Sequence, residues 1–136
     1  MILELVTPEK IVLSEEVLEI TAPTTTGEIT VLPKHVGLIT QITPGELIVR
    51  KQGKIQHFAI TGGILEVSKD KVVILGEHAI RADDIEVAKA EEAKRRAEQR
   101  MKERVSEEDF AEISAELRRS LLELKVARKR RGNRPQ

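Results

Sequence analysis

Short apolar runs fill the first part of the chain, and polar stretches separate them. The runs are rich in Val and Ile and cover Ile2–Val6, Ile11–Leu13, Val17–Ala22, Ile29–Leu32, Leu38–Ile42, Leu47–Arg50, Ile55–Ile60, Ile64–Val67 and Val72–Leu75. Turn-forming pairs such as Pro44-Gly45 and Gly62-Gly63 lie between them. Because no gap is long enough for a crossover helix, the pattern predicts an antiparallel β-sandwich of about ten short strands, in two packed sheets, over residues 1–81.

The pattern changes after Ala82, where glycine is absent until Gly132 and proline until Pro135. Apolar residues then recur every three or four positions, which is the period of an amphipathic helix. One stripe consists of Ala90, Ala93, Ala97 and Met101, and a second of Phe110, Ile113, Leu117, Leu121 and Leu124. These two stripes predict an antiparallel helical hairpin with a basic tail over residues 82–136.

Polar residues mark the expected starts of both helices. Asp83 has Glu86 three positions further on, which is the spacing of a capping box. Ser106 has Asp109 at the same spacing. We therefore expect the first helix to begin at Asp83 and the second at Ser106.

The hairpin is expected to be weak by itself. Small Ala side chains of the first helix would face the large side chains of the second, and each large side chain contributes about 1.5–3 kcal/mol when it is buried. Ordering each backbone residue costs about 1–2 kcal/mol, and the few apolar contacts between the two helices offset only part of this cost. The hairpin should therefore need a second surface, on its own sandwich or on a partner, and could exchange between the two.

Composition narrows the class of protein. A chain of 136 residues fits one domain with an appendage, and its net charge of zero does not identify the kind of partner it binds. We expect a soluble protein, because no apolar run reaches the length of a transmembrane helix and the amino end lacks the basic region of a secretory signal. With no cysteine, disulfides and thiolate sites are excluded.

An enzyme is not indicated. The three histidines, His35, His57 and His78, lack the spacing of metal ligands, and no glycine-rich phosphate loop is present. His57 lies in an alternating strand and is expected at the surface or the edge of the core. We assign no catalytic residue, no metal site and no required cofactor.

Four groups of residues, in this order and spacing, carry a resemblance to a known family. They are Leu5–Glu9, Gly27–Leu38, Pro44–Glu46 and Gly62–Val67 followed by Lys71–Leu75. With the two-helix tail, they resemble the epsilon subunit of the rotary F-type ATP synthase over essentially the full length.

The resemblance implies a non-catalytic central-stalk subunit. Such a subunit turns with the gamma subunit on the membrane c-ring during proton-driven ATP synthesis, and its hairpin can extend along gamma and restrain ATP hydrolysis. It also implies one copy per complex with the alpha and beta catalytic subunits, held peripherally at the cytoplasmic face of the bacterial plasma membrane.

The segment around Pro33 has two compatible interpretations. Pro33 can simply end a strand, with His35 in the loop that follows, because proline cannot donate to an interior ladder. The resemblance implies instead that this turn projects Glu28 and His35 from one end of the sandwich as contacts to gamma or to the c-ring. Thr30 and Gly37 depart from the glycine and proline common in the family, which leaves the shape of the loop open.

A regulatory ATP site is a second family feature. Many bacterial members hold ATP through an acidic residue and an arginine that open the first helix, together with arginines along the hairpin. The matching residues here are Ile85, Glu86, Lys89, Ala90, Arg96 and Arg119, with Glu123 where another arginine is common. Lysine lacks the planar fork of arginine, and Glu123 would repel phosphate. Glu86 and Lys89 also suit a cap and a solvated helix face, so we predict weak or absent ATP binding.

The chain ends in a cluster of basic residues, Lys125, Arg128, Lys129, Arg130 and Arg131. One interpretation is that these cations stabilise the carboxyl end of a helix. The resemblance implies another, in which they and Arg118 and Arg119 meet an acidic loop of the beta subunits when the hairpin extends.

Nucleic-acid binding through this basic tail is the alternative function. Clustered arginines attract phosphate, but proteins that bind single strands usually add aromatic stacking platforms. The chain has only Phe58 and Phe110, and both suit core positions. Direct binding of nucleic acid is therefore the less favoured prediction.

Overall fold

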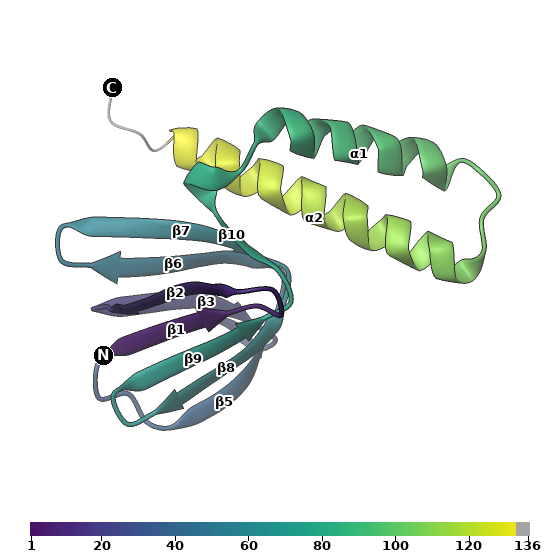
Figure 1. Ribbon diagram of the computed structural model, residues 1–136. Helices are drawn as coiled ribbons and strands as arrows, with labels where there is room; N and C mark the ends of the chain where they lie inside the picture. Colours follow the sequence, from purple (N-terminus) through teal and green to yellow (C-terminus); the bar gives the residue numbers. More distant parts are fainter. Residues whose placement is uncertain (133–136) are drawn as a thin grey trace. The chain divides into compact units, whose positions relative to one another are not determined.

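The computed structural model describes residues 1–132 (Figure 1). The chain divides into two compact units, Met1–Arg81 and Ala82–Gln136. The first unit consists of strands and the second of helices, so the predicted order of a β-sandwich followed by two helices is confirmed.

Ten strands form the first unit. They are β1 (Ile2–Val6), β2 (Ile11–Glu16), β3 (Glu19–Thr24), β4 (Gly27–Val31), β5 (Leu38–Ile42), β6 (Gly45–Lys51), β7 (Lys54–Ile60), β8 (Gly63–Ser68), β9 (Lys71–Gly76) and β10 (Ala79–Arg81). Most agree with the predicted runs to within a few residues. β10 was not among the predicted runs, because three residues are too few to show an alternating pattern.

Two packed sheets were predicted, whereas all ten strands belong to one hydrogen-bonded sheet, which forms the predicted β-sandwich. The strand order is β10-β7-β6-β3-β5-β8-β9-β1-β2, with β4 on β3. The sheet folds over where β3 meets β5, and the pairing there is limited to Thr24 with Ile42. One pair, β1 with β9, is parallel rather than antiparallel, and it joins the first strand to a distant segment of the chain.

The sandwich encloses one apolar core. Inward-facing side chains alternate along the strands, as in Leu3 and Leu5 on β1 and Leu65 and Val67 on β8. Phe58 on β7 is fully buried, as predicted. These residues are the main source of the unit's stability, because burying apolar surface contributes about 25 cal/mol per Å².

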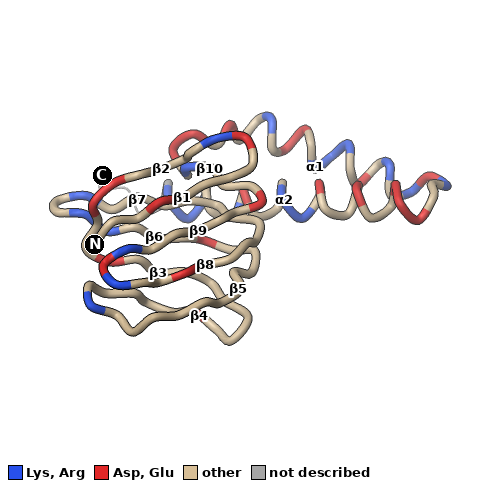
Figure 2. Tube along the Cα trace, turned by 60° about the horizontal axis from the view of Figure 1, so that its bottom comes forward, with Lys and Arg blue, Asp and Glu red and all other residues tan. Residues whose placement is uncertain are grey.

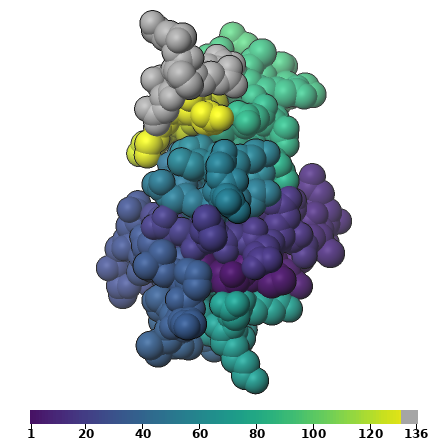
Figure 3. Space-filling model, turned by 90° about the vertical axis from the view of Figure 1, so that its left-hand side faces the viewer, coloured from purple at the N-terminus to yellow at the C-terminus, as the bar shows by residue number. Residues whose placement is uncertain are grey.

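Hydrogen bonds tie the amino terminus into the sandwich. The Met1 amino group donates to the Val17 carbonyl oxygen at 3.2 Å, and the Ile2 amide donates to the Asp70 carbonyl oxygen at 3.0 Å. Figure 3 views this end of the sandwich, where the first residues lie beside the β8–β9 turn. The first strand is therefore fixed at both of its edges.

The second unit begins with a short 3-10 helix, η1 (Ala82–Asp84), followed by α1 (Val87–Met101) and α2 (Glu107–Gly132). The predicted start of the first helix at Asp83 is wrong. Glu86 occupies the N-cap of α1 and makes no capping hydrogen bond with its side chain, because η1 takes up Asp83 and the Ile85 amide donates to Ala82. The predicted cap at Ser106 is confirmed, since its hydroxyl accepts from the Asp109 amide at 3.1 Å.

The two helices pack side by side as an antiparallel pair. Small residues of α1, Ala90 and Ala97, are buried, and so are Ile113 and Leu124 of α2. Phe110 and Leu121 were also expected in this seam, but they are 46% and 45% exposed. The buried side of α2 carries Ser120 where Leu121 was expected, because residues one apart point 100° apart around a helix.

Charged residues follow both helices closely, whereas long parts of the strands carry none (Figure 2). Within residues 1–132, no helix is long and apolar enough to span a lipid bilayer.

Candidate functional site

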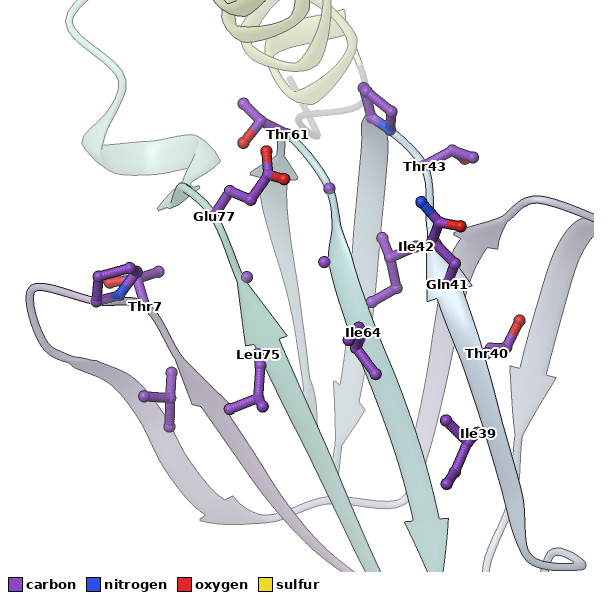
Figure 4. A pocket seen from close by; sticks show the side chains of 16 residues that line it. Thr7, Ile39, Thr40, Gln41, Ile42, Thr43, Thr61, Ile64, Leu75 and Glu77 are labelled. Carbon is purple, nitrogen blue, oxygen red and sulfur yellow. The ribbon is translucent and has the colours of Figure 1, made fainter.

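The sandwich carries an apolar pocket at the ends of β5, β8 and β9 (Figure 4). We call it the strand-end pocket. Its volume is about 910 Å³, and among its lining residues are Val6, Ile39, Ile42, Ile64, Leu75 and Glu77. Every lining residue belongs to the first unit.

The pairing of the strands builds the apolar floor of this pocket. Val6 on β1 pairs with Leu75 on β9, and Leu75 pairs with Ile64 on β8. Since Leu65 and Ile74 face the core, their neighbours Ile64 and Leu75 must face outward. Ile39, Ile64 and Leu75 are accordingly 72%, 50% and 53% exposed, which is unusual for residues on three adjoining strands.

This pocket was not predicted, although the sequence contains a signal for it. Each of the strands β5, β8 and β9 has neighbouring apolar residues, as in Leu38-Ile39, Ile64-Leu65 and Val72–Leu75. A strand with a solvated outer face alternates between apolar and polar residues, so consecutive apolar residues indicate that both faces are covered.

The structure separates two residues that were expected together. Glu28 is the second residue of β4, beside the turn that follows Thr24, whereas Pro33 and His35 lie beyond the other end of that strand. The predicted projection of Glu28 and His35 from one end of the sandwich is therefore wrong. Thr25 lies in the turn that precedes β4, and its backbone amide donates to the carbonyl oxygen of Gln41, which lines the strand-end pocket. Glu28 therefore lies at the end of the sandwich that carries this pocket.

The loop after β4 has its own geometry. β4 ends at Val31, which agrees with the prediction that Pro33 terminates a strand. Lys34 takes a positive φ of 66°, and the His35 ring nitrogen Nδ1 lies 2.7 Å from the Val36 carbonyl oxygen. His35 thus makes a local contact that fixes the turn.

The residues of the predicted ATP site are divided among other contacts. Glu86 Oε2 lies 2.9 Å from Lys89 Nζ, and this carboxylate raises the pKa of Lys89 through a hydrogen bond and its charge. Ile85 and Ala90 are buried. Within residues 1–132, Arg96 and Arg119 are exposed and form no ion pair. The acidic and basic residues that open the helix therefore neutralise each other.

One face of α2 carries three of the seven basic residues expected to contact the catalytic subunits. Arg118, Leu121, Lys125 and Arg128 recur at intervals of three and four and are all exposed. We call this face the cationic stripe. Arg119 lies on the neighbouring face. Arg130 forms an ion pair with Asp83 at 3.5 Å, and Arg131 lies outside the residues whose side chains are described.

Among the described residues, no group of acidic residues and histidines is arranged to hold a metal ion. His57 lies at the edge of the core as predicted, and its Nδ1 atom is 3.6 Å from Glu46 Oε1. This pair connects two neighbouring strands, β6 and β7.

Comparison with known proteins identifies the family. The model for the ATP synthase delta/epsilon chain β-sandwich domain matches residues 1–82, and the model for its long α-helix domain matches residues 83–128. The ATP synthase epsilon chain of Herpetosiphon aurantiacus is 45% identical over 130 residues, which are 96% of both chains. That of Geobacter sulfurreducens is 45% identical over 127 residues, 93% of this chain and 92% of the relative.

The chain belongs to the ATP synthase epsilon chain family. This confirms the prediction of a non-catalytic subunit in the central stalk of an F-type ATP synthase, a complex of ATP synthesis and proton transport.

Solved structures agree with this fold. A chain of the Euglena gracilis mitochondrial ATP synthase, in a structure containing OSCP, F1 and c-ring, superposes with a TM-score of 0.72 at 28% identity, over 95% of this chain and 81% of that one. A chain of the Tetrahymena thermophila mitochondrial central stalk and c-ring has the same fold, with a TM-score of 0.64 at 17% identity over 93% and 95% of the two chains.

Proposed function

We propose that this epsilon-family chain joins the gamma subunit to the membrane c-ring through its sandwich and restrains ATP hydrolysis through its helical hairpin. The single observation that carries this proposal is that each unit exposes a distinct surface of its own, one apolar and one cationic. The strand-end pocket belongs to the sandwich, and the cationic stripe belongs to α2. One copy per complex would lie peripherally at the cytoplasmic face of the bacterial plasma membrane.

We infer that gamma docks on the strand-end pocket. Large apolar side chains exposed on adjoining strands lower the stability of a free surface in water, and a partner that covers them gains about 25 cal/mol for each Å² removed from water. Ile39, Ile64 and Leu75 provide such a surface. A rotor subunit must transmit torque without slipping, and a continuous apolar contact on rigid strands suits that task.

The polar residues of β4 and its loop would form two further contacts. Glu28 is exposed near the pocket end and is our proposed contact to the c-ring. Pro33 and His35 lie beyond the opposite end of β4 and would meet a different part of the stalk. The separation of the two sets supports a sandwich that is held between partners.

We infer that the cationic stripe restrains hydrolysis by binding an acidic loop of the beta subunits. Arg118, Lys125 and Arg128 surround the exposed Leu121, so the stripe offers charge and an apolar anchor together. Arg119 would add a contact from the neighbouring face. Regulatory ATP is expected to bind weakly or not at all, since Glu86 and Lys89 are already paired.

Binding of purified gamma tests the docking surface. In the full chain, Ile64→Ser should weaken gamma binding about tenfold or more, because it places a hydroxyl in the apolar contact. Ile55→Ser is the matched control, since Ile55 is an equally exposed isoleucine on β7, outside the pocket. Wild-type affinity of the Ile64→Ser variant would contradict docking at this pocket.

A further inference from the structure

Glu77 is the one charged residue among those that line the strand-end pocket. It directly follows β9 and lies opposite Gly62, to which its backbone amide donates at 3.0 Å. Figure 4 shows Glu77 at one end of the pocket, on the same side as Thr61, with Leu75 and Ile64 further along the strands. A Cβ atom placed on Gly62 would lie 3.7 Å from Glu77 Oε2, so the carboxylate lies over this glycine.

The carboxylate of Glu77 has no partner within the described residues. Its side chain forms neither a hydrogen bond nor an ion pair anywhere in residues 1–132. Glu4, another acidic residue on the same face of the sheet, is already paired with Lys71 at 3.2 Å. Glu77 is therefore available to a partner, whereas Glu4 is engaged within the sandwich.

An apolar floor next to one carboxylate selects a particular kind of side chain. Leu75 and Glu77 are two residues apart, which is about 7 Å along an extended chain. Lysine and arginine match this arrangement, because their aliphatic stems pack on apolar surface while the charged group reaches a carboxylate. An acidic side chain would be repelled, and a purely apolar one would desolvate Glu77 without compensation.

On the basis of the proposed docking of gamma, we propose that Glu77 determines specificity in the strand-end pocket by pairing with a lysine or arginine of gamma. The aliphatic stem of that residue lies across Ile64 and Leu75, and its cation meets the Glu77 carboxylate. The pocket thus recognises a basic, amphipathic contact residue rather than a purely hydrophobic one.

The test is the affinity of the full-length Glu77→Gln variant for purified gamma, measured across a series of NaCl concentrations. Loss of a charge-assisted pair should weaken binding about tenfold at low salt and flatten the salt dependence. Glu66→Gln is the matched control, because Glu66 is exposed on β8, on the same face, but does not line the pocket. It should bind gamma within about twofold of the wild-type chain.

The Ile64→Ser variant separates this inference from the docking on which it rests. If Ile64→Ser weakens gamma binding while Glu77→Gln has the affinity and salt dependence of the wild-type chain, docking stands and the role of Glu77 is refuted. If neither variant changes gamma binding, both are refuted. A loss with Glu77→Gln that affects binding to isolated c-ring and not to gamma would also overturn the assignment, because the cation would then belong to another partner.

Discussion

Gly63 holds β8 and β9 close together at the edge of the strand-end pocket. It pairs with Gly76 and has a φ of 153°, which favours glycine. A Cβ atom at this position would collide with the Leu75 carbonyl oxygen and lie 2.9 Å from the Gly76 Cα atom. The obstacle is backbone, so no side-chain rotation can relieve it.

Gly63→Ala should therefore lower the free energy of unfolding by about 3 kcal/mol, from the strained φ and the backbone collision together. Gly53→Ala is the matched control, since Gly53 also has a positive φ of 73° but has open space around it. That variant should cost only about 1 kcal/mol. Urea unfolding of both variants measures the difference, and equal losses would contradict the proposed collision.

Glu86 and Lys89 decide the expected response to ATP. Their ion pair raises the pKa of Lys89 and places a carboxylate beside the one cation that opens the helix. Calorimetry with ATP should therefore give a dissociation constant above roughly 1 mM, a binding free energy weaker than about 4 kcal/mol. The double variant Glu86→Asp, Lys89→Arg should bind more tightly, because arginine can grip phosphate with two donors. Micromolar binding by the unmodified chain would contradict this expectation.

At the scale of elements, the two apolar sets of α2 have different tasks. Ile113 is buried, whereas Leu121 is exposed within the cationic stripe. Ile113→Ala should destabilise the hairpin by about 2–4 kcal/mol, and Leu121→Ala by less than about 1 kcal/mol. Hydrogen exchange of the α1 amides measures both effects in the full chain. Equal acceleration of exchange by the two variants would show that the seam has been assigned to the wrong face.

Most strands and both helices could be predicted from the sequence, because their apolar periods of two and of three to four residues are local. The parallel pairing of β1 with β9 could not, since the pattern of one strand does not name its partner. The sequence pattern also predicts Phe110 and Leu121 in the seam, because their spacing fits the same helical stripe as Ile113 and Leu124. Which stripe is buried depends on the partner helix.

The candidate sites were predicted less well than the fold. Glu28 and His35 are close in sequence, but Glu28 lies near the start of β4 and His35 lies beyond its end. A strand rises by about 3.3 Å per residue, so the five residues of β4 carry the chain from one end of the sandwich towards the other. The strand-end pocket combines residues from β1, β5, β8 and β9, which only the strand order brings together. The sequence alone does not predict which distant segments of the chain come into contact.

At the scale of the whole molecule, stability is distributed unevenly. The sandwich has a core drawn from most of its strands, including Leu3, Phe58 and Ile74. The hairpin has one seam of mostly small α1 residues, to which Ser120 adds a polar group. We therefore propose that the sandwich provides permanent attachment and the hairpin regulation.

A chain ending at Val105, which lacks α2, tests this division of labour most directly. Complexes reconstituted with the full chain or the shortened one are compared for retention of gamma and the c-ring and for ATP hydrolysis. We expect the shortened chain still to join the stalk while hydrolysis rises several-fold. Unchanged hydrolysis with normal assembly would contradict an inhibitory hairpin, and loss of the stalk contacts would contradict a self-sufficient sandwich.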